Sequence, residues 1–142
     1  MKVIKDIPYS DGFDSPELDV YFPDTDADRV FIYFHGGGLE HGDKKSAERF
    51  AEYLTERRTI VVSANYRMYP DAKYPDFILD AADAVKWVKV NLSENLTKEE
   101  IFVGGSSAGG YLSMMLCFDK QYLERVGLSN ADIAGYFHDA GQ

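Results

Sequence analysis

The sequence predicts an α/β fold, in which a mostly parallel sheet carries helices on both faces. Short apolar runs without polar alternation recur along the chain, as expected for strands that are buried on both faces of a parallel sheet. Between these runs, apolar residues recur at positions i, i+3, i+4 and i+7, which is the spacing of an amphipathic helix. Because strands and helices alternate, we expect repeated β–α–β units with right-handed connections.

The first third of the chain is predicted to contain mainly strands. Residues 2–9 form an expected edge strand, and Leu18, Val20 and Phe22 alternate in a second strand that ends before Pro23. Apolar runs predict further strands at 30–34, 59–64, 101–104 and 133–138. Three helices are predicted from these spaced residues: Ala47, Phe50, Ala51 and Leu54; Phe77, Ala81, Ala84, Val85 and Val88, after Pro75; and Tyr111, Met114, Met115 and Phe118.

Composition predicts one domain over residues 1–142 and restricts its partners. A hydrophobic content of 45% excludes a disordered chain. The net charge of −9 disfavours nucleic acid and anionic membranes as partners, because both are bound through an excess of Lys and Arg. No apolar run approaches the ~20 residues that span a bilayer, and the first residues do not resemble a secretory signal. The single cysteine, Cys117, fits a reducing compartment, so we expect a cytoplasmic protein.

The strongest chemical signal is GGSSAGG at residues 104–110, between a predicted buried strand and a predicted helix. Its central part fits G-x-S-x-G, in which a serine occupies a sharp turn from strand to helix and acts as a nucleophile. Glycines two positions away on either side remove Cβ atoms that would clash in this turn. Only Ser107 has both glycines, since the pattern centred on Ser106 ends in Ala108. Ser107 is therefore the predicted nucleophile.

Taken alone, residues 104–110 are also compatible with two kinds of segment that contain no catalytic serine. One is a turn of small residues, and the other is a phosphate-binding loop. The phosphate loop is disfavoured because no lysine follows the glycines, as a Walker motif requires. A dinucleotide-binding loop is disfavoured because it should follow the first strand of the sheet, whereas this segment comes late in the chain.

A second signal is HGGGL at residues 35–39, directly after the predicted strand 30–34. Glycines at the carboxyl end of a strand let backbone N–H groups approach a ligand closely. The N–H groups of Gly36, Gly37 and Ala108 are predicted to form an oxyanion hole. His35 and Gly38 are expected to shape the loop. The segment alone is equally compatible with a flexible glycine turn, but both motifs in this order, each after a buried strand, favour catalysis.

Together these motifs resemble those of the α/β-hydrolase superfamily, specifically the HGGG-type esterases and lipases related to hormone-sensitive lipase. The segment NYRMYPDAKYP, residues 65–75, resembles the Y-R-x-x-P segment of that family through Tyr66, Arg67 and Pro70. The resemblance covers residue 31 to the C-terminus. It implies a serine carboxylesterase that hydrolyses small or short-acyl esters through an acyl-enzyme, without a metal or an organic cofactor.

The chain departs from the family pattern in two respects. The residue before the nucleophile, often acidic in the family, is Ser106. The family order of the triad is Ser, then Asp or Glu, then His, and the last two normally follow later strands. We expect the chain to stop after about the sixth strand of the fold, as an incomplete domain without the acid and the base. Alone, it is expected to be inactive or a very weak esterase.

The last predicted strand ends in His138 and Asp139, at the sheet edge where ligands bind in open α/β folds. Both residues are candidates for the substrate pocket. Because neighbouring residues of a strand point to opposite faces, they are not expected to act as a catalytic pair.

Two further functions are compatible with the sequence. One is a non-catalytic hydrolase-like module that binds a small acid or a protein partner, which the missing base favours. The other is an amide-cleaving relative, such as an arylformamidase or a peptidase-like enzyme. We also expect self-association, because the last strand would leave an unpaired edge and an uncovered apolar face.

Overall fold

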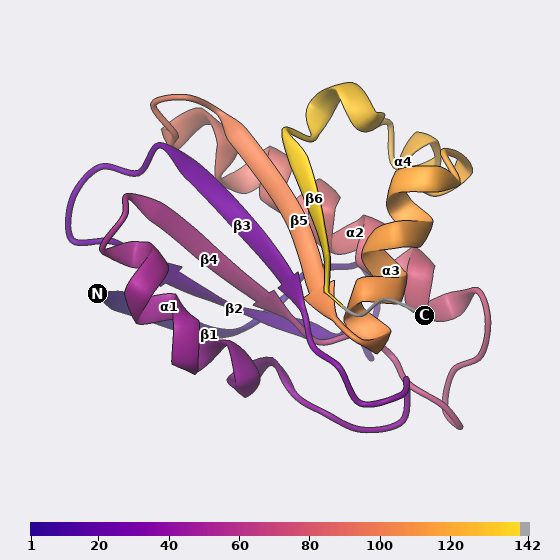
Figure 1. The fold of residues 1–142 in the computed structure, drawn as a ribbon. Coiled ribbons are helices and arrows are strands. Elements are labelled where there is room, and N and C mark those ends of the chain that lie inside the picture. The colour runs from indigo at the N-terminus through magenta and orange to yellow at the C-terminus, as the bar shows by residue number, and fades with distance from the viewer. Residues whose placement is uncertain (140–142) are drawn as a thin grey trace.

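The computed structural model describes residues 1–139, and its centre is a six-stranded sheet with the strand order β1-β2-β4-β3-β5-β6 (Figure 1). Strand β1 pairs antiparallel with β2, and β2 pairs antiparallel with β4, whereas the pairs β3–β4, β3–β5 and β5–β6 are parallel. The strands are β1 (Lys2–Pro8), β2 (Glu17–Phe22), β3 (Arg29–Phe34), β4 (Thr59–Ala64), β5 (Glu100–Ser106) and β6 (Gly135–Asp139). The predicted mostly parallel sheet is therefore confirmed.

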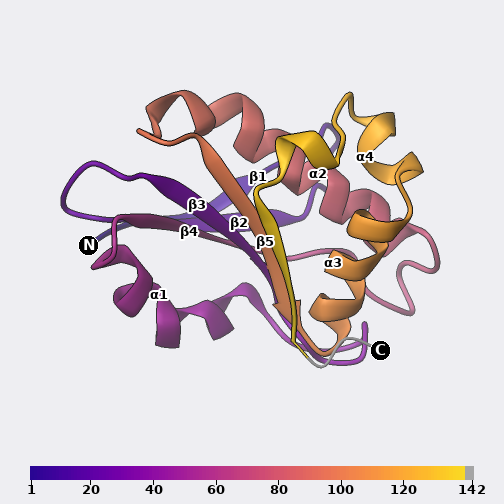
Figure 2. The same ribbon diagram turned by 45° about the horizontal axis from the view of Figure 1, so that its top comes forward.

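Helices cover both faces of the sheet, as predicted. Helix α1 (Glu48–Thr55) lies on one face, and helices α2 (Asp76–Asn91) and α3 (Ala108–Phe118) lie on the other (Figure 2). A short helix α4 (Gln121–Arg125) follows α3, and three 3₁₀ turns are present at Lys44–Ala47, Ser93–Asn95 and Asn130–Asp132. None of the helices in residues 1–139 is long and apolar enough to cross a membrane.

The larger hydrophobic core lies between the sheet and helices α2 and α3. It includes Ile32 of β3, Val103 of β5, Val85 of α2 and Leu112 of α3, all without solvent exposure. A smaller cluster lies under α1, which contributes Ala51. This unequal division leaves a cavity on the α1 face of the sheet.

The element boundaries differ from the sequence predictions mainly at turns. Strand β4 has the predicted limits, whereas β5 continues to Ser106 and β6 covers Gly135–Asp139. Helix α4 was not predicted, because five residues are too few to show a helical period. Phe118, the last of the spaced apolar residues that predicted the third helix, is the last residue of α3, and its side chain is 76% exposed rather than buried.

The topology brings the two sequence motifs together. Strands β3 and β5 are direct neighbours, and Phe34 pairs with Gly105 at their carboxyl ends. The glycine loop after β3 and the turn from β5 into α3 therefore leave the sheet side by side, at the lower edge of the sheet in Figure 1.

Candidate active site

Ser107 lies between β5 and α3 in a backbone conformation that residues with a side chain rarely adopt, with φ 51° and ψ −112°. Such a conformation costs roughly 1–3 kcal/mol and persists only where neighbouring contacts hold it. The Ser107 N–H donates a 2.7 Å hydrogen bond to the carbonyl of Asp139, and its carbonyl accepts one of 2.9 Å from the N–H of Tyr111. The side chain is exposed and makes no capping bond to α3. Its hydroxyl is therefore accessible.

The glycines that flank Ser107 allow α3 to lie directly against the end of β3. A Cβ atom on Gly109 would collide with the carbonyl group of Phe34, and a Cβ on Gly105 would lie 2.5 Å from the Phe34 carbonyl oxygen. Both contacts are with backbone, which cannot move aside as a flexible side chain can. The spacing of the glycines thus reflects close packing of α3 on β3.

The two serines of the motif face different cavities. Ser107 lines a cavity of about 230 Å³ together with Gly38, Leu39, Ala108 and Tyr111. The Ser106 hydroxyl lies 3.3 Å from the Tyr33 hydroxyl and donates to the Asp139 carboxylate, also at 3.3 Å. Ser106 belongs to a larger cavity on the α1 side of the sheet. Of the two, only Ser107 shares a cavity with the glycine loop.

Gly36 packs directly on the turn that holds Ser107. A Cβ atom on Gly36 would lie 2.9 Å from the Ser106 carbonyl oxygen and 3.5 Å from the Cβ of Ser107. Ala108 is the first residue of α3, where backbone N–H groups have no partner within the helix and the helix dipole is positive. The structure thus brings Gly36 and Ala108, two of the three predicted oxyanion residues, together with Ser107.

Gly37, the third predicted oxyanion residue, begins a tight turn. Gly37 has φ 126° and Gly38 has φ 67°, both in the left-handed region that favours glycine. The Gly37 carbonyl accepts hydrogen bonds from the N–H groups of Glu40 (3.2 Å) and His41 (3.0 Å). A Cβ atom on Gly37 would collide with the His41 carbonyl. The turn therefore has no room for a side chain at Gly37.

His35 is buried beneath this loop, with 1% of its surface exposed. Its Nδ1 lies 2.8 Å from the Gly36 carbonyl oxygen, and because a carbonyl only accepts, Nδ1 carries the proton. The ring stacks on Tyr66 at 4.5 Å between centroids, and the Tyr66 hydroxyl donates a 2.8 Å hydrogen bond to the His35 carbonyl. Burial lowers the pKa of His35, which favours the neutral imidazole.

The segment of residues 65–75 is anchored by a buried carboxylate of α2. Asp80 is 2% exposed and accepts hydrogen bonds from the Arg67 guanidinium at 2.9 to 3.1 Å and from the Arg67 N–H at 2.8 Å. The same segment reaches the glycine loop, because the Tyr69 N–H donates to the Leu39 carbonyl at 2.8 Å. Arg67 and Asp80 thus form an ion pair that fixes this segment to α2.

His138 and Asp139 point to opposite faces of β6, as expected. His138 Nδ1 lies 2.7 Å from the Ser113 hydroxyl, which itself donates to the Gly110 carbonyl at 2.7 Å. His138 therefore donates to Ser113 and is joined to α3. Asp139 lines the cavity on the α1 side. In residues 1–139 the structure shows no hydrogen bond from either side chain to the Ser107 hydroxyl.

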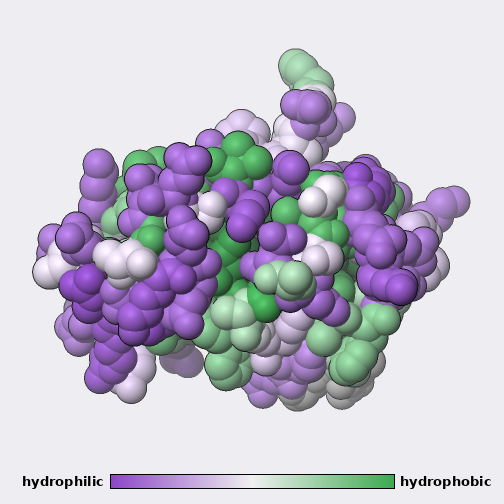
Figure 3. All heavy atoms as spheres, turned by 90° about the horizontal axis from the view of Figure 1, so that it is seen from above, coloured by the Kyte–Doolittle hydropathy of each residue, from purple (hydrophilic) through white to green (hydrophobic). Residues whose placement is uncertain are grey.

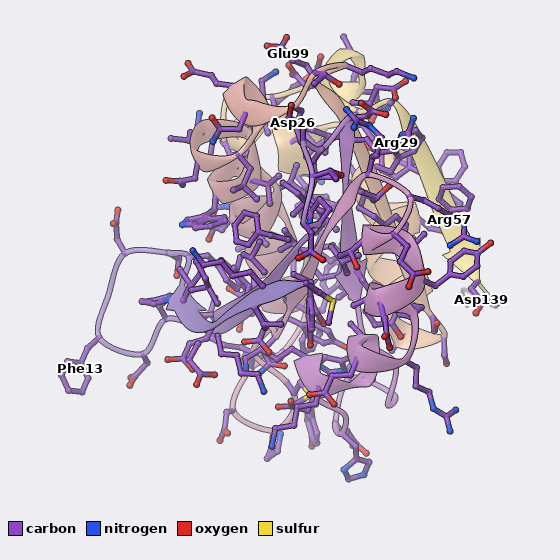
Figure 4. The ribbon with its side chains drawn as sticks, turned by 90° about the vertical axis from the view of Figure 1, so that its left-hand side faces the viewer. Phe13, Asp26, Arg29, Arg57, Glu99 and Asp139 are labelled. Atoms are coloured by element: carbon purple, nitrogen blue, oxygen red, sulfur yellow. The ribbon has the colours of Figure 1, made fainter. Side chains whose placement is uncertain are left out.

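The cavity on the α1 side has a volume of about 520 Å³. Its walls include the aromatic side chains of Phe31, Phe50, Tyr53, Phe102 and Phe137. Arg29, Arg57 and Asp139 also line it and lie on the same side of the molecule in Figure 4. Figure 3 shows hydrophobic surface between two mostly hydrophilic regions.

One charged cluster near the glycine loop was not predicted from the sequence. The Lys44 ammonium is 2.7 Å from Asp6 and 3.1 Å from Asp19, and the side chains of Lys44 and Asp19 are 7% and 1% exposed. No sequence pattern distinguishes these residues from other surface charges. In residues 1–139 no group of three or more His, Cys, Asp or Glu side chains is placed to hold a metal ion.

The fold and the two motifs define an α/β-hydrolase, and the comparison with known families agrees. Residues 31–136 match the alpha/beta hydrolase fold family, and the chain belongs to that family. The resemblance drawn from the HGGGL and G-x-S-x-G segments is therefore confirmed.

The curated relatives are mainly ester hydrolases. Carboxylesterase NlhH of Mycobacterium tuberculosis is 34% identical over 110 residues, covering 75% of this chain and 34% of that protein. Gibberellin receptor GID1A of Arabidopsis thaliana is 32% identical over 137 residues, covering 89% of this chain and 37% of that protein. This chain thus spans about a third of the length of the curated relatives it matches.

Solved structures of esterases share the fold. An esterase from Thermogutta terrifontis is 30% identical, with a TM-score of 0.63 over 71% of this chain and 39% of that chain. Esterase B from Lactobacillus rhamnosis has a TM-score of 0.77 over 96% of this chain and 45% of that chain. At 22% identity, the second likeness concerns the fold alone.

Proposed function

We propose that this chain supplies the nucleophile and the oxyanion hole of a serine carboxylesterase that acts on small or short-acyl esters. The observation that carries the proposal is the conformation of Ser107: an exposed hydroxyl on a strained turn, against Gly36 and at the start of α3. The relatives named carboxylesterases support an ester substrate. The Thermogutta terrifontis esterase was solved with butyrate and with propionate bound, which supports short acyl groups.

In the proposed reaction the Ser107 oxygen attacks the ester carbonyl carbon while the hydroxyl proton passes to a base. The N–H groups of Gly36, Gly37 and Ala108 stabilise the negative oxygen of the tetrahedral intermediate. Collapse of this intermediate breaks the bond to the alcohol, which takes up the proton and leaves an acyl-enzyme. Water then attacks the acyl-enzyme, releasing the acid and restoring Ser107.

In this proposal, residues outside 1–142 supply the base and the acid of the triad. The proposal is supported by the surroundings of the three histidines. His35 is buried with Nδ1 bonded to the glycine loop, His41 is exposed in that loop, and His138 is bonded to Ser113. A cytoplasmic location is part of the same proposal, supported by the single cysteine.

Substitution of the two serines in the complete protein tests the assignment. Ser107→Ala should abolish hydrolysis of p-nitrophenyl acetate and butyrate, whereas Ser106→Ala should retain most of it. Thermal unfolding of both variants checks that they fold. Equal losses from both substitutions would contradict the assignment of Ser107. Binding of butyrate by a wild-type protein with no turnover would instead favour a non-catalytic module.

We further propose that the chain self-associates with a second copy through β6 and the adjoining aromatic cavity. In the described part of the chain β6 is the terminal strand of the sheet and pairs only with β5. Phe137 on this strand is 58% exposed and forms part of the cavity wall, so the unpaired edge and the apolar surface are continuous. A second copy offers the same edge, and pairing two such edges about a two-fold axis covers both.

A further inference from the structure

Lys44 lies in the 3₁₀ turn that ends the glycine loop, and its charge is buried. The ammonium contacts Asp19, which is 1% exposed, at 3.1 Å and Asp6, which is 62% exposed, at 2.7 Å. Asp19 also accepts a 2.9 Å hydrogen bond from the N–H of Asp6. There β1 has an irregular register and Asp6 has φ 60°. A lysine is seldom buried unless it is paired, and here the β1–β2 hairpin supplies both partners.

The backbone of Lys44 is also hydrogen-bonded to neighbouring elements. Its N–H donates a 2.8 Å hydrogen bond to the Asn65 side chain, and its carbonyl accepts one of 2.7 Å from the buried Ser63 hydroxyl. Ser63 belongs to β4, and Asn65 follows that strand. The residue is therefore fixed to β1, β2 and β4 at once.

Gly42 connects this fixed point to the candidate oxyanion loop. A Cβ atom on Gly42 would collide with the Gly36 carbonyl and would lie 2.5 Å from Nδ1 of His35. Gly42 thus closes over the hydrogen bond between His35 and Gly36, and Gly36 in turn packs on Ser107. Lys44 lies two residues after Gly42. Fixing Lys44 therefore also keeps Gly42 closed over this hydrogen bond.

We infer that Lys44 is a positioning residue, which clamps the far end of the glycine loop to the β1–β2 hairpin and so fixes Gly36 against Ser107. A loop with four glycines at positions 36, 37, 38 and 42 has many accessible conformations, and one anchored end restricts them. The β1–β2 hairpin lies before residue 31, where the match to the family begins. The partners of Lys44 in the clamp are therefore outside the family motifs. Its importance for catalysis rests on the proposed function.

Hydrogen–deuterium exchange of the 142-residue chain tests the clamp. The N–H groups of Glu40 and His41, bonded to Gly37, report on closure of the loop. Lys44→Met alone leaves Asp19 buried without its partner and endangers the fold. The informative variant is therefore the neutral pair Asp19→Asn with Lys44→Met. It should keep its thermal midpoint but exchange these two amides about tenfold faster, with no change in β4.

Two matched variants separate the clamp from a general effect. Lys44→Arg keeps the charge and should retain the slow exchange, and Lys45→Met removes an exposed neighbouring charge and should change nothing. Wild-type exchange in the neutral pair would overturn the clamp. In the complete protein the neutral pair should lower kcat and leave KM unchanged, and an unchanged kcat would overturn the positioning role. Exchange needs no turnover, so it decides the clamp even if Ser107 proves not to be a nucleophile.

Discussion

The carbonyl oxygen of Asp139 accepts a 2.7 Å hydrogen bond from the N–H of Ser107, and this bond ties the end of β6 to the strained turn. The side chain of Asp139 meanwhile faces Ser106 and the aromatic cavity. Strand β6 therefore supports the conformation of Ser107 through its backbone, while its side chains are engaged elsewhere.

The 142-residue chain alone should be a very poor esterase. Without a positioned base the Ser107 hydroxyl stays protonated, and loss of the histidine in a serine hydrolase costs roughly 10⁶ in kcat. His138→Ala should lower the thermal midpoint, because it breaks the bond to Ser113, without changing the residual hydrolysis of p-nitrophenyl acetate. Substantial turnover that disappears in His138→Ala would reveal a triad built from this chain.

Gly37→Ala in the complete protein should lower kcat by about 10²–10³, because a side chain forces the turn to open and displaces an oxyanion donor. The thermal midpoint should also fall, because the added Cβ collides with the His41 carbonyl, but kcat per folded molecule should fall far more. Gly12→Ala is the matched control: Gly12 also has a positive φ, but no atom lies within 4 Å of an added Cβ. A large loss of stability with normal kcat per folded molecule would mean that the turn is only structural.

Acidification below about pH 6.5 should destabilise the chain through His35. Burial lowers the pKa of His35 in the folded state, so the unfolded state binds more protons as the pH falls through 6.5. The contribution of His35 is therefore constant above that value and declines below it, until the folded-state pKa is reached. Thermal midpoints between pH 7.5 and 5 should fall less steeply in His35→Gln than in wild type. A slope in His35→Gln equal to that of wild type would contradict this role of His35.

Removing Arg67 and removing Asp80, which form an ion pair, should lower the free energy of unfolding by different amounts. Asp80 is almost fully buried, whereas the Arg67 side chain is 46% exposed and can be hydrated when its partner is removed. Arg67→Met leaves a buried carboxylate and should destabilise by about 2–3 kcal/mol, below the ~3–5 kcal/mol of a fully buried pair. Asp80→Asn should cost less. Urea unfolding measures both values, and a larger effect of Asp80→Asn would contradict this reasoning.

Light scattering at micromolar concentration should show a dimer or a larger assembly. The charge of −9 opposes association, but at physiological salt its repulsion extends only ~8 Å, whereas strand pairing and apolar burial act at contact. Phe137→Ser should weaken the assembly. Phe13→Ser is the control, because Phe13 is fully exposed and projects alone from the loop after β1 (Figure 4). A stable monomer of 16.0 kDa would contradict self-association.

The sequence was sufficient to predict the order of the six strands and the three longer helices, because apolar runs and helical spacing are local properties. The glycine spacing that singled out Ser107 as the predicted nucleophile corresponds in the structure to a packing contact between α3 and β3. The role of Lys44 could not be predicted, because its burial depends on Asp6 and Asp19, which are distant in the chain. The bond from His138 to Ser113 was missed for the same reason: it depends on how β6 lies against α3.

The direct pairing of β3 with β5 also bears on how the chain folds. Arg29 and Glu100, at the start of these strands, are paired although 71 positions separate them in sequence. Closing so long a loop costs conformational entropy before contacts between the strands can offset that cost. This pairing is therefore expected to form late and to slow folding. The strained turn at Ser107 needs β3 as its neighbour. A nascent chain that has not yet emerged as far as β5 therefore contains the glycine loop but not yet Ser107, the residue on which the loop packs.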